Sequence, residues 1–488
     1  MTEIGNIRLT RSLLYFLWTL FIPFNGMAQD FRGKLDRLMQ DYESLNWSGV
    51  LYAGNKDTVL YKKAIGLADH SGSRKIGLNS LFKTESAGKM FTAVRILQLA
   101  AEGKLDLEQN IAGLLPEWKI PNADSIRIRH LLTHTSGLSS PWEHPDYVFG
   151  KLYSPAEIKK IIEEAPVIFT SPGEKSYYSN SGYILLEEII SKLDKKPFTA
   201  SVREHIFERA GMKFTRPLGD SVLPADAAFP SYQVTSDRFA ADDTRYGYGQ
   251  ASGAGGWMST AGDMFRFAQA YLREQLLPRK WMDIQVTNNH TLDSSSAFRR
   301  LGMAVLKEKF PGSFIIGHNG GGKGFTTDVY FDYYKGQIVV WCSNMYGTAY
   351  ELTGKVFAIF NQQEPAKPVP QERIRLAEWA LSRAGHSTEL NKAVLDSLGI
   401  VQPGEFSFFA AFDNLTLIGE HAAAALIIRG GRAFFPGAVY IWIKSGENAL
   451  QLNQKKEASA FFEKAATLAL EQKDSALAEQ IRKKIEGL

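Results

Sequence analysis

The stretch SAGKMFTAVRILQLAAEGKL, residues 86–105, combines a candidate nucleophile with the start of a helix. Its apolar residues recur at spacings of four, three and four, at Met90, Val94, Leu97 and Ala101. This periodicity predicts an amphipathic helix, and Gly103 is expected to end it. The other elements of the fold are expected on both sides of this helix in the sequence.

Two side chains at the start of this stretch are suited to nucleophilic chemistry. Ser86 and Lys89 lie three residues apart, so both project from one face of a helical turn. Attack by a serine hydroxyl needs a base within hydrogen-bond reach, and the N-terminus of a helix favours the negative charge that develops. A second Ser-x-x-Lys match, at Ser80 and Lys83, does not open the helix. Ser86 and Lys89 are therefore the candidate pair.

Segments typical of β-strands lie on both sides of this helical region. They are expected at residues 50–53, 58–61, 314–316, 329–331 and 337–342. Helical stretches, such as 184–193 and 264–272, lie between them. The pattern predicts an α/β domain in which an antiparallel sheet is built from both ends of the domain and carries a helical insert.

A proline-rich segment, QQEPAKPVPQ at residues 362–371, follows this domain. It predicts a linker between a catalytic domain at 29–361 and a small all-α domain at 372–488, so a chain ending near Gln363 is expected to stay soluble and reactive. Five residues match the relative positions of a tetratricopeptide (TPR) helical hairpin: Trp442, Gly446, Ala458, Phe462 and Ala465. A TPR-like unit and ordinary helical packing both remain open, because one repeat cannot bury its own face.

Residues 1–28 have the pattern of a signal peptide. Arg8 and Arg11 precede the apolar stretch 13–22, and small residues lead to an expected cleavage between Ala28 and Gln29. The apolar stretch is shorter than the ~20 residues that a membrane span needs, although a retained anchor is the alternative to cleavage. The expected location is therefore the periplasm or the exterior.

Composition excludes several classes of function. The 56 basic and 52 acidic residues leave a net charge of +4 with no basic cluster, so nucleic-acid binding is not expected. The single cysteine, Cys342, excludes an intramolecular disulfide and lies in an apolar run typical of a buried bystander. His130 and His134 are spaced like zinc ligands, but neither the accompanying glutamate nor a third ligand is evident. No metal site is therefore expected.

Further motifs follow the candidate pair in a fixed order. The two with polar side chains are Tyr178-Ser179-Asn180 and His318-Asn319-Gly320. Four more stretches accompany them, at residues 66–69, 102–105, 130–138 and 255–260. In this ordered set the sequence resembles the serine β-lactamase and penicillin-binding protein superfamily, above all its class C β-lactamase, DD-peptidase and esterase branch. The resemblance runs from about residue 40 to about residue 360.

The resemblance implies a role for each matching residue. Ser86 would be acylated with Lys89 as its general base, and Tyr178 would pass the proton to the leaving group. Asn180 would bind the acyl-side amide of the substrate. Gly320 would let the substrate lie against its strand, and the backbone N–H groups of Ser86 and Gly321 would form the oxyanion hole.

Positive charge in this site is expected to come from three side chains. A tyrosine with the usual pKa of ~10 needs a cationic environment, which Lys89 and His318 are expected to provide for Tyr178. His318 replaces the lysine usual in β-lactamases, and a neutral histidine would hold a substrate carboxylate less firmly. Lys323, in a glycine-rich turn, is predicted to bind substrate by partly restoring that charge; a solvated turn lysine is the alternative.

The resemblance therefore implies an exported serine hydrolase with no metal or organic cofactor. It would act through an acyl-Ser86 intermediate on amide or ester bonds of cell-wall D-amino-acid peptides, esters or β-lactams. Its expected partners are that small substrate and, through the helical region, a protein. The alternative is a non-catalytic penicillin-binding-like sensor or scaffold with a partner-binding tail, against which the intact Ser86, Lys89 and Tyr178 set argues.

Overall fold

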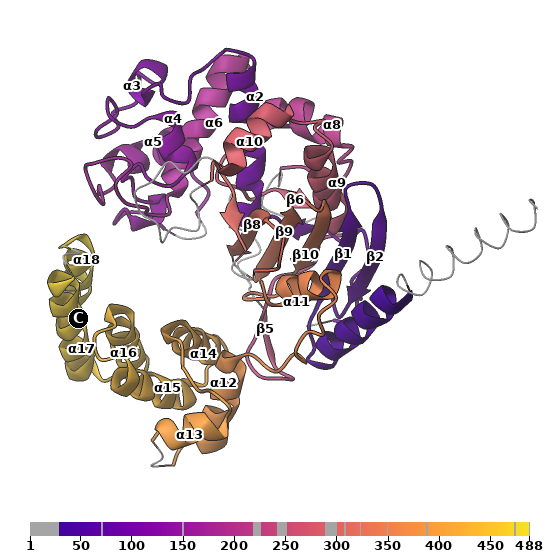
Figure 1. Ribbon diagram of the computed structural model, residues 1–488. Coiled ribbons are helices and arrows are strands. Elements are labelled where there is room, and N and C mark those ends of the chain that lie inside the picture. Colours follow the sequence, from indigo (N-terminus) through magenta and orange to yellow (C-terminus); the bar gives the residue numbers. More distant parts are fainter. Residues whose placement is uncertain are drawn as a thin grey trace, which may run out of the picture.

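The computed structural model shows a sheet-containing body and an arc of helices that follows it (Figure 1). It describes residues 29–69, 72–148, 151–217, 226–241, 251–287, 300–306, 309–322, 324–348, 350–386, 389–472 and 475–487. The expected signal peptide at 1–28 lies outside these ranges. Within them, no helix is both long and apolar enough to cross a membrane.

The body is organised around a six-stranded antiparallel sheet. Its strand order is β2 (Val59–Ile65), β1 (Gly49–Asn55), β10 (Gln337–Ser343), β9 (Phe325–Asp332), β8 (Ile315–Gly322) and β7 (Ala304–Val305). The N-terminal hairpin pairs with the last strand, in the register that places Gly49 opposite Ser343. This pairing confirms the predicted antiparallel sheet from both ends of the domain.

Helices and two short strand pairs fill the segment between β2 and β7. The helices are α2 (Lys89–Ala101), α3 (Ile111–Leu114), α4 (Ile128–Leu132), α5 (Pro155–Glu164), α6 (Asn180–Asp194), α7 (Phe198–Val202), α8 (Glu208–Ala210), α9 (Ala261–Leu272) and α10 (Arg279–Thr287). The strand pairs are β3 (Phe82–Lys83) with β6 (Met258–Ser259), and β4 (Ser231–Gln233) with β5 (Phe239–Ala241). The predicted helical insert is therefore present.

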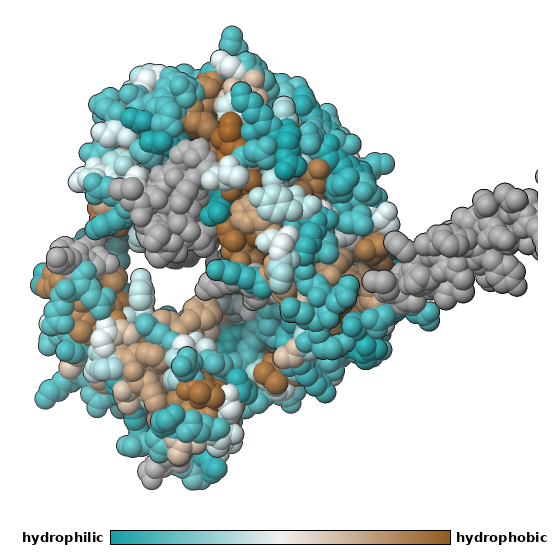
Figure 2. All heavy atoms as spheres, in the orientation of Figure 1, coloured by the Kyte–Doolittle hydropathy of each residue, from teal (hydrophilic) through white to brown (hydrophobic). Residues whose placement is uncertain are grey.

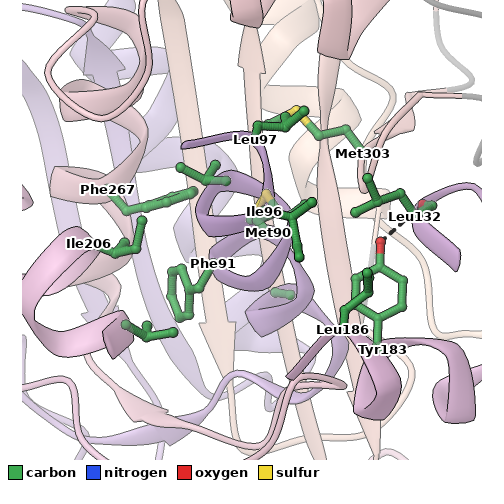
Figure 3. Close-up of a cluster of buried hydrophobic side chains, with 14 of the residues drawn as sticks. Met90, Phe91, Ile96, Leu97, Leu132, Tyr183, Leu186, Ile206, Phe267 and Met303 are labelled. Atoms are coloured by element: carbon green, nitrogen blue, oxygen red, sulfur yellow. Dashed lines mark hydrogen bonds between the residues drawn. The ribbon is translucent and has the colours of Figure 1, made fainter. Parts of the chain in front are cut away.

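Helix α2 lies at the centre of this insert, and its apolar neighbours surround it (Figure 3). The prediction that it is amphipathic is wrong, because every residue from Lys89 to Ala100 is buried. Its polar residues are satisfied inside the protein: Arg95 pairs with Asp194 at 2.6 Å and with Glu102 at 2.8 Å. The predicted end is confirmed, since Gly103 follows with a φ of 70°.

The opposite face of the sheet is covered by elements from the two ends of the domain (Figure 1). Residues 29–44 are helical and pack there together with α11 (Glu351–Phe360). The core of this layer includes Leu35, Tyr42, Trp47, Trp341 and Phe357. Both faces of the sheet are therefore closed, and the site must lie at an edge or an end of the strands.

The tail is defined here as residues 372–486, and all regular structure in its described residues is helical. Its helices are α12 (Glu372–Arg383), α13 (Lys392–Ser397), α14 (Glu405–Leu417), α15 (His421–Phe434), α16 (Val439–Gln451), α17 (Lys455–Glu471) and α18 (Ser475–Glu486). In α16, a Cβ at Gly446 would lie 2.5 Å from the Phe462 ring, so glycine permits the close approach of α17. The likeness to a TPR hairpin stays a prediction.

The tail and the body share a hydrophobic core. Residues 361–371 form neither helix nor strand, as expected of a linker. However, Val234 and Ala240 of the β4–β5 hairpin are buried in one cluster with Leu376, Phe408 and Phe412 of the tail. A chain ending near Gln363 would expose this apolar surface, so the shared core argues against the independence that the linker predicts.

Candidate active site

The candidate nucleophile lies where a short turn enters α2. The 3₁₀ turn η1 (Glu85–Gly88) carries Ser86, and Lys89 is the first residue of α2. The Lys89 Nζ donates a hydrogen bond to the Ser86 Oγ at 3.2 Å. The predicted proximity of this pair is therefore present in the structure.

Two further acceptors fix the Lys89 amine. It donates to the Asn180 Oδ1 at 2.6 Å and to the Ala254 carbonyl oxygen at 2.7 Å. No carboxylate is among these three acceptors. Burial lowers the pKa of Lys89 to about 7, against a smaller upward contribution from Glu85. A substantial fraction of the amine is therefore neutral at neutral pH and can accept a proton.

The residue before the nucleophile has an unusual backbone conformation. Glu85 has a φ of 45°, in the left-handed region that non-glycine residues seldom occupy. Its carbonyl oxygen accepts a hydrogen bond from the Gly256 N–H at 3.2 Å, and a Cβ at Gly255 would lie 1.9 Å from that oxygen. Only glycine at position 255 allows this approach, which fixes the turn that presents Ser86.

A tight turn at residues 252–255 supplies the carbonyl that binds Lys89. The Gly253 carbonyl accepts a hydrogen bond from the Thr92 Oγ1 at 2.8 Å, and the Gly253 N–H donates to Glu187 at 2.7 Å. Burial raises the pKa of Glu187 to about 8. The turn is thus attached to α2 through Thr92 and to α6 through Glu187, and this holds the Ala254 carbonyl in place.

Tyr178 is half-buried, and its hydroxyl is buried, between Ser86 and two histidines. Its ring stacks on His134 with ring centres 4.1 Å apart, and the Lys89 Nζ lies 5.0 Å from its centre. The His134 Nδ1 accepts a hydrogen bond from the Ser179 N–H at 3.0 Å. Burial raises the pKa of Tyr178 above its usual value, while its hydrogen bond with Ser86 acts in the opposite direction. The phenol is therefore protonated and can relay a proton.

Asn180 is the first residue of α6 and is held on both sides of its amide. Its Oδ1 accepts from Lys89, and its Nδ2 donates to the Ser140 Oγ at 3.2 Å. The Asn180 N–H also donates to the Ser140 Oγ, at 3.0 Å. This arrangement orients the amide toward Lys89; its contact with a substrate remains a prediction.

The charge state of His318 differs from the one that the sequence led us to expect. Its ring centre lies 6.5 Å from that of Tyr178, and its Nδ1 lies 2.5 Å from the Asn319 carbonyl oxygen. Burial, with a smaller effect of the Lys89 charge, lowers the pKa of His318 to about 3. The side chain is neutral, so the expectation that His318 supplies positive charge to Tyr178 is wrong. Burial outweighs the reference pKa on which that expectation rested.

The glycines of β8 bring the strand against the nucleophile turn. A Cβ at Gly320 would lie 2.0 Å from the Thr84 carbonyl oxygen and 2.9 Å from the Ser86 N. Gly320 therefore makes room for η1, and its expected role of letting a substrate lie against the strand stays a prediction. At Gly321, the nearest atom to a Cβ would be in the Tyr346 ring at 4.0 Å. The expected oxyanion-hole residues Ser86 and Gly321 thus belong to two segments in direct contact.

The structure leaves other sequence candidates outside the site. Ser80 Oγ accepts from the Gly77 N–H, and Lys83 pairs with Glu85 at 3.6 Å. His130 accepts from the Arg127 N–H at the start of α4 and so has a different partner from His134. Cys342 is buried, and burial raises the pKa of its thiol to about 12, as expected of a bystander. Lys323 lies outside the described residues.

Four groups in the site carried no clear signal in the sequence. The Ala254 carbonyl reaches Lys89, and Ser140 reaches Asn180, only through tertiary packing. Glu187 looks like an ordinary residue of an amphipathic helix until the turn at 252–255 is seen against it. His134 lies in a motif stretch, but nothing in that stretch indicates that its ring stacks on Tyr178.

The chain is similar to several known proteins. The chain is 28% identical over 327 residues to penicillin-binding protein 4* of Bacillus subtilis, covering 62% of this chain and 69% of that protein. It is 26% identical over 295 residues to a putative D-alanyl-D-alanine carboxypeptidase of Escherichia coli, covering 53% and 67% respectively. The fold matches a D-amino acid amidase of Ochrobactrum anthropi with a TM-score of 0.58 at 22% identity, covering 69% and 99%.

The family assignment rests on a match across most of the body. The family model described as Beta-lactamase matches residues 35–362, well over half of the 488 residues. The matched segment begins in the N-terminal helix and ends after α11, so it contains the whole sheet and every group of the site described above. The chain belongs to the beta-lactamase family.

Proposed function

We propose that the protein is a serine hydrolase that cleaves amide or ester bonds through an acyl-Ser86 intermediate. The observation that carries this proposal is the contact between Lys89 and Ser86: the amine lies 3.2 Å from the hydroxyl and has a pKa of about 7. A lysine in this state is a base at neutral pH, which an exposed lysine is not.

The site supports a two-step reaction. Neutral Lys89 accepts the Ser86 proton as the serine oxygen attacks the substrate carbonyl, and the N–H groups of Ser86 and Gly321 stabilise the resulting oxyanion. Tyr178 passes a proton to the leaving amine or alcohol as its bond to the carbonyl carbon breaks, and is reprotonated from Lys89. Water then attacks the acyl-Ser86 ester, its proton returning to Ser86, and releases the acid.

The neutral His318 bears on the choice of substrate. D-Amino-acid peptides or amides, esters and β-lactams all present a carbonyl that this machinery can attack. A neutral imidazole offers a hydrogen bond but no fixed charge to a substrate carboxylate. We therefore propose that uncharged esters and amides are turned over more efficiently than substrates that depend on a carboxylate anchor.

The direct test is covalent labelling with a serine-directed fluorophosphonate, followed by mass spectrometry to locate the adduct. A screen of a penicillin, a D-alanyl-D-alanine peptide and a small ester then ranks the substrate classes. Labelling at Ser86 with turnover of at least one substrate supports the proposal. Stable acylation without turnover of any of them favours the alternative, a sensor.

The pH dependence of acylation follows from the pKa of Lys89. Above about pH 7 the amine is neutral and accepts the serine proton; below it, the ammonium cannot. We expect kcat/KM for a small uncharged ester to rise with pH through about 7 and then level off. His134 and His318 have lowered pKa values and stay neutral over this range, and Tyr178 stays protonated. A rise that continues to about pH 10 would contradict a perturbed Lys89.

Lys323 gives a second prediction about charge. If it partly replaces the missing cation, Lys323→Ala lowers kcat/KM several-fold for an anionic substrate, within the ~1 kcal/mol of a partly exposed pair. A neutral ester of similar shape should be unaffected, and the loss should shrink as salt rises. Equal losses on both substrates would show that Lys323 only shapes its turn.

A further inference from the structure

The tail is attached to the body on both sides of the active site. At its beginning, the buried Arg373 of α12 donates to the Gln233 carbonyl at 2.8 Å and to the Tyr346 carbonyl at 3.0 Å. The Tyr346 ring contacts Phe406 of α14, with ring centres 6.4 Å apart, and approaches Gly321 of β8. This first attachment therefore lies beside the oxyanion-hole strand.

The second attachment lies on the Tyr178 side. Gln480 of α18 donates a hydrogen bond to the Glu143 carbonyl oxygen at 3.0 Å, across 337 positions of sequence. Glu143 belongs to the turn η2 (Pro141–Glu143), and its carboxylate accepts from the Tyr177 hydroxyl at 2.9 Å. Tyr177 directly precedes Tyr178, and Ser140, which holds Asn180, directly precedes η2. The end of the tail is thus linked to the segments that carry the proton relay.

Between these two points the tail is continuous. From α14 onward each helix packs on the next, through α15, α16 and α17 to α18, and α12 packs on α14. Together the body and the tail close a ring, and an opening remains between them in the space-filling view (Figure 2). Gly321 lies beside the first attachment, and the segment that carries Tyr178 lies beside the second.

We propose that the tail acts as a strap that limits which substrates reach Ser86, and this inference rests on the proposed hydrolase function. Small acyl compounds and the free ends of short peptides pass the strap. Branched or cross-linked polymers do not, because one side of the site is bounded by α12 and α14 and the other by α18 against η2. Gln480 is then a specificity-determining residue far from the chemistry.

The experiment compares two probes that carry one warhead. The first is a small alkyl fluorophosphonate, and the second is the same fluorophosphonate joined by a short linker to a branched dextran. In the wild-type chain we expect the dextran probe to acylate Ser86 about tenfold more slowly or worse, as for a site that is open about a tenth of the time. The variant Gln480→Glu replaces the donor by a carboxylate that repels the Glu143 carbonyl.

Gln480→Glu should raise the acylation rate of the dextran probe about fivefold, the factor that corresponds to a hydrogen bond of ~1 kcal/mol. The small probe should react at an unchanged rate. The matched control is Gln472→Glu, because Gln472 donates to the Gly437 carbonyl at 2.8 Å within the tail; this variant should change neither rate.

The outcomes that overturn the strap differ from the outcome that overturns the proposed hydrolase function. A wild-type chain that reacts with both probes at one rate overturns the strap. So does a dextran rate that is unchanged in Gln480→Glu, or that rises equally in Gln472→Glu. Failure of the small probe to label Ser86 in the wild type overturns the proposed hydrolase function instead.

Discussion

Replacing Ser86 by alanine is expected to lower turnover by a factor on the order of 10⁶ and to abolish covalent labelling. The side chain provides the only atom that we assign as the attacking nucleophile, and Lys89 at 3.2 Å has no other hydroxyl to activate among the acceptors of its amine. The fold should be unaffected, because alanine is sterically compatible with the η1 turn. Labelling, steady-state kinetics and thermal unfolding measure the three quantities.

The second Ser-x-x-Lys match supplies the control for this experiment. Ser80→Ala removes a hydroxyl that bonds only to the local backbone in the described contacts, and Lys83 is paired with Glu85. This variant should label and turn over like the wild type. A Ser86→Ala variant that still labels, beside a Ser80→Ala variant that does not, would exchange the roles of the two serines.

Arg373→Ala is expected to destabilise the protein by on the order of 3 kcal/mol. The guanidinium is buried, and burial lowers the pKa of Arg373 to about 10. It donates to the carbonyl oxygens of Gln233 and Tyr346 and to the Gln371 side chain at 2.8 Å. Alanine would remove the Arg373 donor from the Tyr346 carbonyl at the junction of tail and body, and the Gln233 carbonyl would keep only its hydrogen bond from the Asn414 amide at 3.0 Å. Chemical denaturation measures the change in the free energy of unfolding.

Arg375 is the matched control for this second prediction. Its guanidinium bonds to the Leu398 carbonyl oxygen, which lies within the tail rather than across the junction. Arg375→Ala should cost less and leave acylation unchanged, whereas Arg373→Ala should also slow acylation, because the Tyr346 turn lies beside Gly321. Equal losses of stability in the two variants would mean that the hydrogen bonds of Arg373 across the junction contribute no more to stability than the bond of Arg375 within the tail.

The sequence predicts the fold where local patterns and tertiary structure agree. The alternation and turn residues of β1, β2, β9 and β10 suffice to place the strands, and the antiparallel sheet follows from their positions in the chain. For α2 the same reasoning fails in part: its apolar spacing indicates one buried face, yet Arg95 and Gln98 are buried as well. Their partners, such as Asp194, come from distant segments that periodicity does not reveal.

In the candidate site, too, the sequence predicts the local features and misses those that depend on tertiary structure. Ser86 and Lys89 lie within one turn of helix, so their proximity is a local property that the spacing predicts. The Ala254 carbonyl meets Lys89, and Ser140 meets Asn180, only in the folded chain. The charge state of His318 depends on burial, which a motif does not report. The sequence therefore indicates which residues take part in the site. Their protonation states and the hydrogen bonds that hold them in place can be seen only in the structure.

The pairing of Gly49 with Ser343 has a consequence for biosynthesis. During synthesis the β1–β2 hairpin emerges early but cannot join the sheet until β10 has been translated, and β8 must also be present before the Ser86 turn is packed. Long-range pairing of this kind makes folding slow and leaves strand edges exposed in the nascent chain. The ribosome must therefore complete nearly the whole body before the Ser86 site can assemble, so the nascent chain lacks this site during most of its synthesis.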